Sequence, residues 1–286
     1  MNRKHKAILY IVLSSFCFAL MSVFVRLAGD IPSVQKSFFR NLIAFFFAVI
    51  FLIKNKIWLT DAKKNLGYLI LCSTFGTLGI FCNFYAVDHL VLADASMLNK
   101  MSPFFAIVFS FLILGEKVKP TQAFCVVGAF IGSLFILKPT FANMALVPSL
   151  IGLCGGLFAG VAYTFVRLLG ERGEKGPFIV FFFSGFSCLV SLPYLLLHYH
   201  PMSPSQLGFL LLAGLAASGG QFSITAAYCN APAREISVYD YSQIIFSALL
   251  GFLLFSQVPD FLSVIGYLTI CVMAVVMFLY NNRKTC

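Results

Sequence analysis

Residues 92–116 read LADASMLNKMSPFFAIVFSFLILGE, an apolar run interrupted by a few polar positions and by one lysine, Lys100. A run of this length can cross a bilayer as a helix, which needs about 20 apolar residues. An ammonium group at membrane depth costs about 3 kcal/mol on insertion scales. Lys100 is therefore either neutralised by a partner or used for function.

The rest of the chain has the composition of a polytopic membrane protein. Of its 286 residues, 60% are hydrophobic and 10% are charged, whereas soluble domains carry about 25% charged residues. The first apolar run is too long for the core of a signal peptide and ends without an A-x-A-like site. The sequence thus predicts an all-α fold of ten transmembrane helices near residues 7–28, 34–53, 66–87, 92–115, 120–138, 147–169, 176–197, 206–229, 233–255 and 261–281.

Basic residues predict the orientation of these helices. Fifteen Lys and Arg residues fall in the loops and termini of one side, and only Lys138 falls on the other. Because cytoplasmic loops of membrane proteins are rich in Lys and Arg, both termini are expected in the cytoplasm, in a plasma or inner membrane. The net charge of +10 does not indicate nucleic-acid binding, since the basic residues lie in short caps between apolar runs.

A second segment repeats the first at an offset of 140 residues. Residues 232–256 read PAREISVYDYSQIIFSALLGFLLFS and align with residues 92–116, with matches that include Ala93/Ala233 and Ser102/Ser242. The repeat divides the chain into residues 1–140 and 141–286, with five helices in each half. An odd number of helices per half makes the two copies run in opposite directions, which is a common transporter design.

The sequence resembles EamA-type proteins of the drug/metabolite transporter superfamily. The likeness is carried by Arg40 and Asn41 in SFFRNLIAFFFAVIFL, by ASMLNKMSPFFAIVFSFLILGEKVKPTQ and by GAFIGSLFILKP. The second half departs from the pattern, with Gln243 at a usual proline and Ser256 at a usual glutamate. The resemblance implies two inverted five-helix repeats around a central cavity, with alternating access for small metabolites such as amino acids, nucleosides, vitamins and S-adenosylmethionine.

The repeat pairs Lys100 with Asp240. Lys100 stands eight residues into its window, about 12 Å along a helix that rises 1.5 Å per residue. Asp240 lies at a similar depth in the ninth window, entered from the opposite side. Two interpretations are open: a charged pair in a cavity that binds a polar substrate or exchanges a proton at Asp240, or a closed ion pair that holds two helices together.

Arg40 also has two interpretations. It lies about six residues into the second window, where its planar fork can bind a substrate carboxylate or phosphate in the cavity. Alternatively, it reaches out to the headgroups together with Lys36. Lys36 and Arg26 are expected at the membrane interface because they lie near helix ends.

Uncharged polar residues extend the candidate substrate site. Each is a helix–helix hydrogen-bonding group or part of a cavity wall, because an amide in lipid must find a partner. Pro103 is expected to kink its helix just after Lys100, and the GxxxG segments 128–132 and 156–160 fit close helix packing. The remaining candidate substrate residues are Asn99, Tyr239, Gln243 and Tyr163.

No enzyme, metal-site or nucleotide-binding motif occurs in the sequence, so no catalytic residue, metal or cofactor is predicted. The leading hypothesis is a secondary transporter driven by gradients, either a monomer or a homodimer, with protons as a candidate co-substrate. The charges of Arg40, Lys100 and Asp240 sum to about +1, which suits a zwitterionic or carboxylate-bearing substrate such as an amino acid or an S-adenosylmethionine-like compound. The alternatives are an intramembrane enzyme that modifies lipids or metabolites, and a channel subunit.

Overall fold

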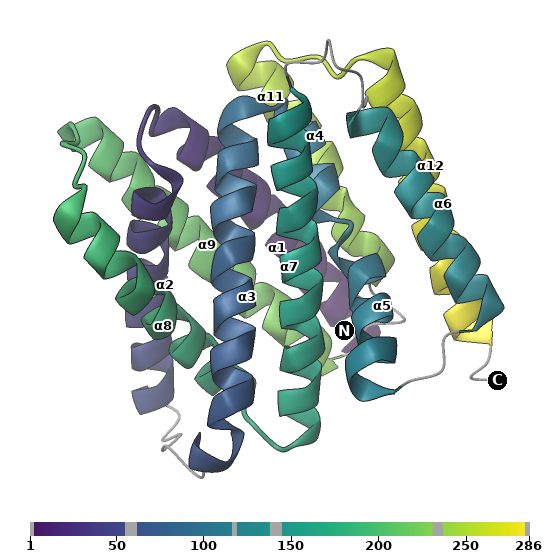
Figure 1. Ribbon diagram of the computed structural model, residues 1–286, viewed down its shortest axis with the longest axis horizontal. Helices are drawn as coiled ribbons and strands as arrows, with labels where there is room; N and C mark the ends of the chain where they lie inside the picture. The colour runs from purple at the N-terminus through teal and green to yellow at the C-terminus, as the bar shows by residue number, and fades with distance from the viewer. Residues whose placement is uncertain (1–2, 55–61, 116–118, 138–144, 231–236, 284–286) are drawn as a thin grey trace.

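The structure is a computed structural model that describes residues 3–54, 62–115, 119–137, 145–230 and 237–283 (Figure 1). The described residues form helices and short connections, with no strand among them. Eight helical segments are long and apolar enough to span a membrane, and two shorter apolar helices accompany them. The elements are α1 (Arg3–Leu27), α2 (Ser33–Lys54), α3 (Ala62–His89), α4 (Leu92–Asn99), α5 (Ser102–Leu114), α6 (Pro120–Leu137), α7 (Leu146–Glu171), α8 (Gly176–Leu197), α9 (Pro204–Asn230), η1 (Ser237–Tyr241), α11 (Ser242–Phe255) and α12 (Phe261–Arg283).

Each of the ten predicted windows coincides with a helical segment, but the fourth is broken. The fourth window ends as α4 at Asn99 and resumes as α5 at Ser102. Pro103 explains this break, because it has no N–H to offer the carbonyl of Asn99 and its ring crowds that carbonyl. In the ninth window, the described residues start with the 3₁₀ helix η1, which continues directly into the α-helix α11 at Ser242. The break and the 3₁₀ turn fall at the segments of the sequence that carry Lys100 and Asp240.

The helices pack in matched pairs. Helix α1 packs along α9, and α7, the first helix of the second half, packs along α3. The contact of α5 with α7 corresponds to the contact of α11 with α1. The contact of α2 with α9 corresponds to the contact of α8 with α3. Helices α2 and α8 form one side of the molecule and α6 and α12 the other, while α3 and α7 run together through the centre of the view (Figure 1).

Glycines allow the closest helix contacts. A β-carbon on Gly156 would lie 2.5 Å from the carbonyl oxygen of Leu98, and one on Gly160 would lie 2.8 Å from that of Ser102. The glycines of segment 156–160 therefore seat α7 directly against the backbone of the α4–α5 break. In the same way, a β-carbon on Gly266 of α12 would lie 2.8 Å from the carbonyl oxygen of Gly132 of α6. Both GxxxG segments thus lie at close helix contacts.

Candidate functional site

The α4–α5 break brings Lys100 to the end of a helix inside the protein. Lys100 caps α4, and its N–H still donates to the carbonyl of Ser96 at 3.0 Å. The next N–H, that of Met101, donates to Leu98 at 3.2 Å, which tightens the last turn before α5 begins. The side chain of Lys100 therefore leaves the backbone where the helix is interrupted.

Lys100 forms an ion pair with Asp240. The distance from Lys100 Nζ to Asp240 Oδ2 is 2.5 Å, and the side chains are only 8% and 13% exposed. The hydroxyl of Ser15 in α1 donates to Asp240 Oδ1 at 3.1 Å, and the hydroxyl of Tyr241 donates to the carbonyl oxygen of Lys100 at 3.2 Å. The ion pair and these two hydrogen bonds therefore join the α4–α5 break, η1 and α1. Lys100 and Asp240 are also the two residues that the repeat aligns.

Tyr163 of α7 lies near the buried charges of the site. Its side chain interacts electrostatically with Asp240 and with Arg40. Tyr163 is 50% exposed, whereas Arg40 is 6% exposed and Asp240 is largely buried.

Arg40 is buried and does not extend to the surface. One nitrogen of its guanidinium, Nη1, donates to Oδ1 of Asn41, whose amide in turn donates to Ser187 Oγ of α8 at 2.7 Å and to Ser37 Oγ at 3.1 Å. Arg40 Nε is buried without a hydrogen-bond partner. Of the two interpretations of Arg40, contact with headgroups is wrong, because the guanidinium lies inside the helix bundle.

The other predicted site residues lie on several elements and differ in burial. Asn99 is the last residue of α4 and Tyr239 lies in η1 next to Asp240, and both are partly accessible. Gln243 is buried in the first turn of α11. The predicted residues thus come from α2, α4, α7, η1 and α11. Ser15, which binds Asp240, was not predicted, because one serine in an apolar helix carries no signal of its partner.

A second ion pair joins α2 to α3. Lys36 of α2 is fully buried, and its Nζ lies 2.6 Å from Asp88 Oδ1 at the end of α3. Arg26 Nη2 donates to the carbonyl of Leu90 at 2.7 Å, and the guanidinium lies 5.3 Å from the ring centre of Phe255. Lys36 and Arg26 lie near helix ends, where the membrane interface was expected, and protein groups bind both of them. Opposite charges at the ends of consecutive windows were the available signal for the pair of Lys36 with Asp88.

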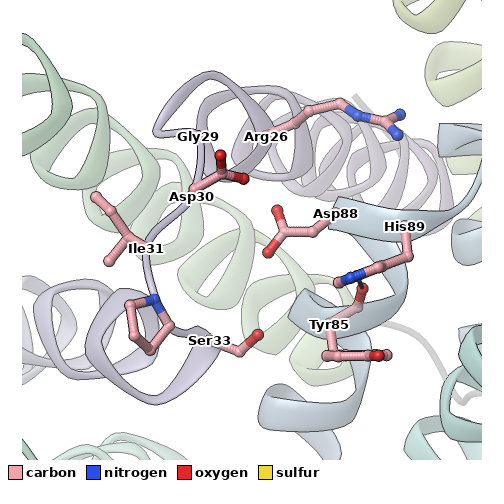
Figure 2. A pocket seen from close by; sticks show the side chains of 9 residues that line it. Arg26, Gly29, Asp30, Ile31, Ser33, Tyr85, Asp88 and His89 are labelled. Carbon is pink, nitrogen blue, oxygen red and sulfur yellow. Dashed lines mark hydrogen bonds between the residues drawn. The ribbon is translucent and has the colours of Figure 1, made fainter. Parts of the chain in front are cut away.

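A cavity of about 280 Å³ lies beside this second pair. Figure 2 shows the carboxylates of Asp30, from the α1–α2 connection, and Asp88, from α3, on either side of it, with Tyr85 and His89 completing one wall. Across the described ranges, no three His, Cys, Asp or Glu side chains gather as they would around a metal ion.

Comparison with known proteins finds similarity to membrane transporters. The sequence model of the EamA-like transporter family matches residues 5–138 and, separately, residues 147–279. The chain is 32% identical to the pseudopaline exporter CntI of Pseudomonas aeruginosa (strain UCBPP-PA14) over 94% of this chain and 95% of the exporter. It is 28% identical to solute carrier family 35 member G1 of Homo sapiens over 93% of this chain and 76% of that protein. A solved structure, described only as a crystal structure of a protein, has a TM-score of 0.67 over 99% of this chain and 100% of that one at 15% identity, which indicates a shared fold.

Proposed function

This chain belongs to the EamA-like transporter family, and we propose that it is a gradient-driven secondary transporter that moves a small polar metabolite across the inner membrane by alternating access. Its matched family and its named relatives are transporters, so the chain is a membrane transporter and not an enzyme. Both termini lie in the cytoplasm in this proposal, and the working unit is a monomer or a homodimer.

The ion pair of Lys100 and Asp240 carries the proposal. Interrupted helices leave backbone groups without helical partners, and membrane proteins tolerate this where the interruption is buried in protein or lines a cavity. Transporters place such breaks at the substrate and ion site near the middle of the membrane. Here the α4–α5 break and the 3₁₀ turn η1 meet at one buried pair.

Two inverted repeats, residues 1–140 and 141–286, supply the alternation. The family model matches each half separately. The matched helix contacts support the same division, since α1 on α9 and α7 on α3 are equivalent when the halves are exchanged. Rocking of one half against the other would expose the pair of Lys100 and Asp240 first to one side of the membrane and then to the other.

Asp240 is the proposed proton-coupling residue. The charged and titratable groups that face it are Lys100 at the end of α4 and Tyr163 of α7, while Ser15 of α1 donates a hydrogen bond to its carboxylate. Protonation of Asp240 would remove the charge that compensates Lys100 and so break the ion pair. The transporter would then change conformation only when Asp240 is protonated and the substrate is bound.

The substrate we propose is zwitterionic or carboxylate-bearing, in the size range of an amino acid or an S-adenosylmethionine-like compound. Arg40, Lys100 and Asp240 together leave about one positive charge inside the bundle. A net positive site favours a substrate with an anionic group and disfavours an isolated organic cation. The similarity to an exporter of pseudopaline supports a small organic solute.

A solute screen followed by counterflow tests the proposal. Purified protein is screened by thermal shift against amino acids, nucleosides and sulfonium compounds, since a ligand that binds only the folded state raises the melting temperature. Compounds that raise it are then tested for counterflow in proteoliposomes. At least one zwitterionic or carboxylate-bearing compound is expected to stabilise the protein and to exchange. Flat responses in both assays would refute the proposed function.

A further inference from the structure

The ion pair of Lys100 and Asp240 does not compensate the buried positive charge of Arg40. Its side chain is buried, and within the described part of the chain the ion pairs of the bundle join Lys36 to Asp88 and Lys100 to Asp240 and leave Arg40 out. A buried charge without a counter-ion costs several kcal/mol in real proteins. Arginine does not escape this cost by losing its proton, because it stays charged in proteins.

We infer that Arg40 forms an anion subsite that binds a carboxylate of the substrate, while Lys100 stays with Asp240. The inference rests on the proposed function, and it assigns the anionic group of the substrate to Arg40 and not to Lys100. Lys100 already holds a carboxylate oxygen at 2.5 Å, so its positive charge is compensated by the protein. The positive charge of Arg40 is the one that a substrate anion would compensate.

The hydrogen bonds of Arg40 define which side of the guanidinium is available. Asn41 accepts from Nη1 only, whereas Nε is buried and has no partner. The side that Asn41 does not occupy is the edge formed by Nε and Nη2. Two parallel N–H groups on one edge match the two oxygens of a carboxylate, which is the bidentate arrangement that arginine favours.

The guanidinium is also held in place before any ligand binds. Asn41 is fully buried and is fixed by hydrogen bonds to Ser37 of its own helix and to Ser187 of α8. Side chains fixed in this way lose little freedom on binding, which favours affinity. Tyr163 of α7 is half exposed and interacts electrostatically with Arg40.

The variant Arg40→Met separates a binding role from a structural one. Methionine fills similar apolar volume and removes the uncompensated charge, so the ligand-free variant is expected to melt at a higher temperature than the wild type. The probes are a panel of L-amino acids and the matching L-amino-acid amides, which differ only at the carboxylate. In the wild type, the amino acid with the largest thermal shift is expected to exceed its amide, and Arg40→Met is expected to raise its half-saturating concentration at least tenfold and to abolish the difference.

Arg26→Met is the matched control, because Arg26 also has a buried nitrogen without a partner, Nη1, but it is held by the carbonyl of Leu90 and the ring of Phe255. It is expected to lower the melting temperature and to leave the preference for the acid over the amide unchanged. A lower melting temperature for Arg40→Met with the preference intact would overturn the subsite, as would a wild type that does not distinguish acid from amide. Counterflow that persists in either case leaves the proposed function standing, whereas absence of binding and counterflow for every solute refutes both.

Discussion

At the scale of single residues, the fold depends on how each intramembrane charge is compensated. Lys100 has Asp240 at 2.5 Å and Lys36 has Asp88 at 2.6 Å, and each acid also lies close to further polar or charged groups. The aligned repeat predicted the pairing of Lys100 with Asp240, because equivalent positions in inverted halves meet near the middle of the membrane. The contributions of Ser15 and of the Tyr241 hydroxyl were not predictable, since they depend on how α1 packs on η1 and not on any local pattern.

A charge cycle at Lys100 and Asp240 tests the buried pair. Lys100→Met leaves the Asp240 carboxylate buried and unpaired, so it is expected to cost about 3–5 kcal/mol of stability at pH 8. The double variant Lys100→Met/Asp240→Leu replaces both charges by apolar groups and is expected to recover most of this loss, because such replacements are often neutral or stabilising. The stability of each variant is measured by thermal unfolding in detergent. Neither variant is expected to transport.

Additive losses in this cycle would contradict the pairing. The stability loss of the double variant is compared with the sum of the losses of Lys100→Met and Asp240→Leu. If the two were equal, the side chains would contribute independently, and the ion pair would not be what stabilises this part of the bundle.

At the scale of helices, the predictable and unpredictable features have different causes. All ten windows coincide with helical segments because spanning a bilayer requires long apolar runs, which the sequence displays directly. The break after Asn99 was indicated by Pro103, whereas the 3₁₀ turn at 237–241 had no comparable signal, since Gln243 stands where the repeat has Pro103. The position of α7 on the α4–α5 break follows from glycines whose role is apparent only when the partner backbone is placed.

Gly156→Ala tests the contact of α7 with the break. A methyl group at this position would lie 2.5 Å from the carbonyl oxygen of Leu98, and backbone cannot move aside as a flexible side chain does. The variant is expected to lose about 1–3 kcal/mol of stability, as overpacked sites do, and to lose transport. Thermal unfolding and counterflow measure the two effects.

Gly170→Ala is the control in the same helix, because nothing lies within 4 Å of a β-carbon built there. It is expected to be neutral or stabilising by up to about 1 kcal/mol, since alanine is the better helix former. Equal effects of the two substitutions would show that helix propensity, and not the contact with Leu98, determines the response at Gly156.

At the scale of the whole molecule, several contacts hold the helices together at one end of the bundle. The pair of Lys36 and Asp88, the bond of Arg26 to Leu90 and the reciprocal bonds between Gln35 and His200 tie α1, α2, α3 and the α8–α9 connection together at one end. In the proposed orientation, with both termini in the cytoplasm, that end lies on the side away from the cytoplasm. In this arrangement, the central pair would be closed off from the outside.

Reporter fusions test the orientation. Green fluorescent protein at the C-terminus is expected to fluoresce, because it folds in the cytoplasm, where the basic loops are retained. Alkaline phosphatase fused after His200 is expected to be active, because that connection lies on the opposite side. Phosphatase activity at the C-terminus together with none after His200 would reverse the orientation.

The most direct test of the central claim is proton-coupled flux through Asp240→Asn in proteoliposomes. The solute is the one that gives the largest thermal shift and counterflow in the wild type, and uptake is measured with and without an imposed pH gradient. Wild-type uptake is expected to depend on the gradient, whereas Asp240→Asn is expected to lose that dependence and to keep exchange of the same solute. Gradient-dependent uptake by Asp240→Asn equal to that of the wild type would contradict the account.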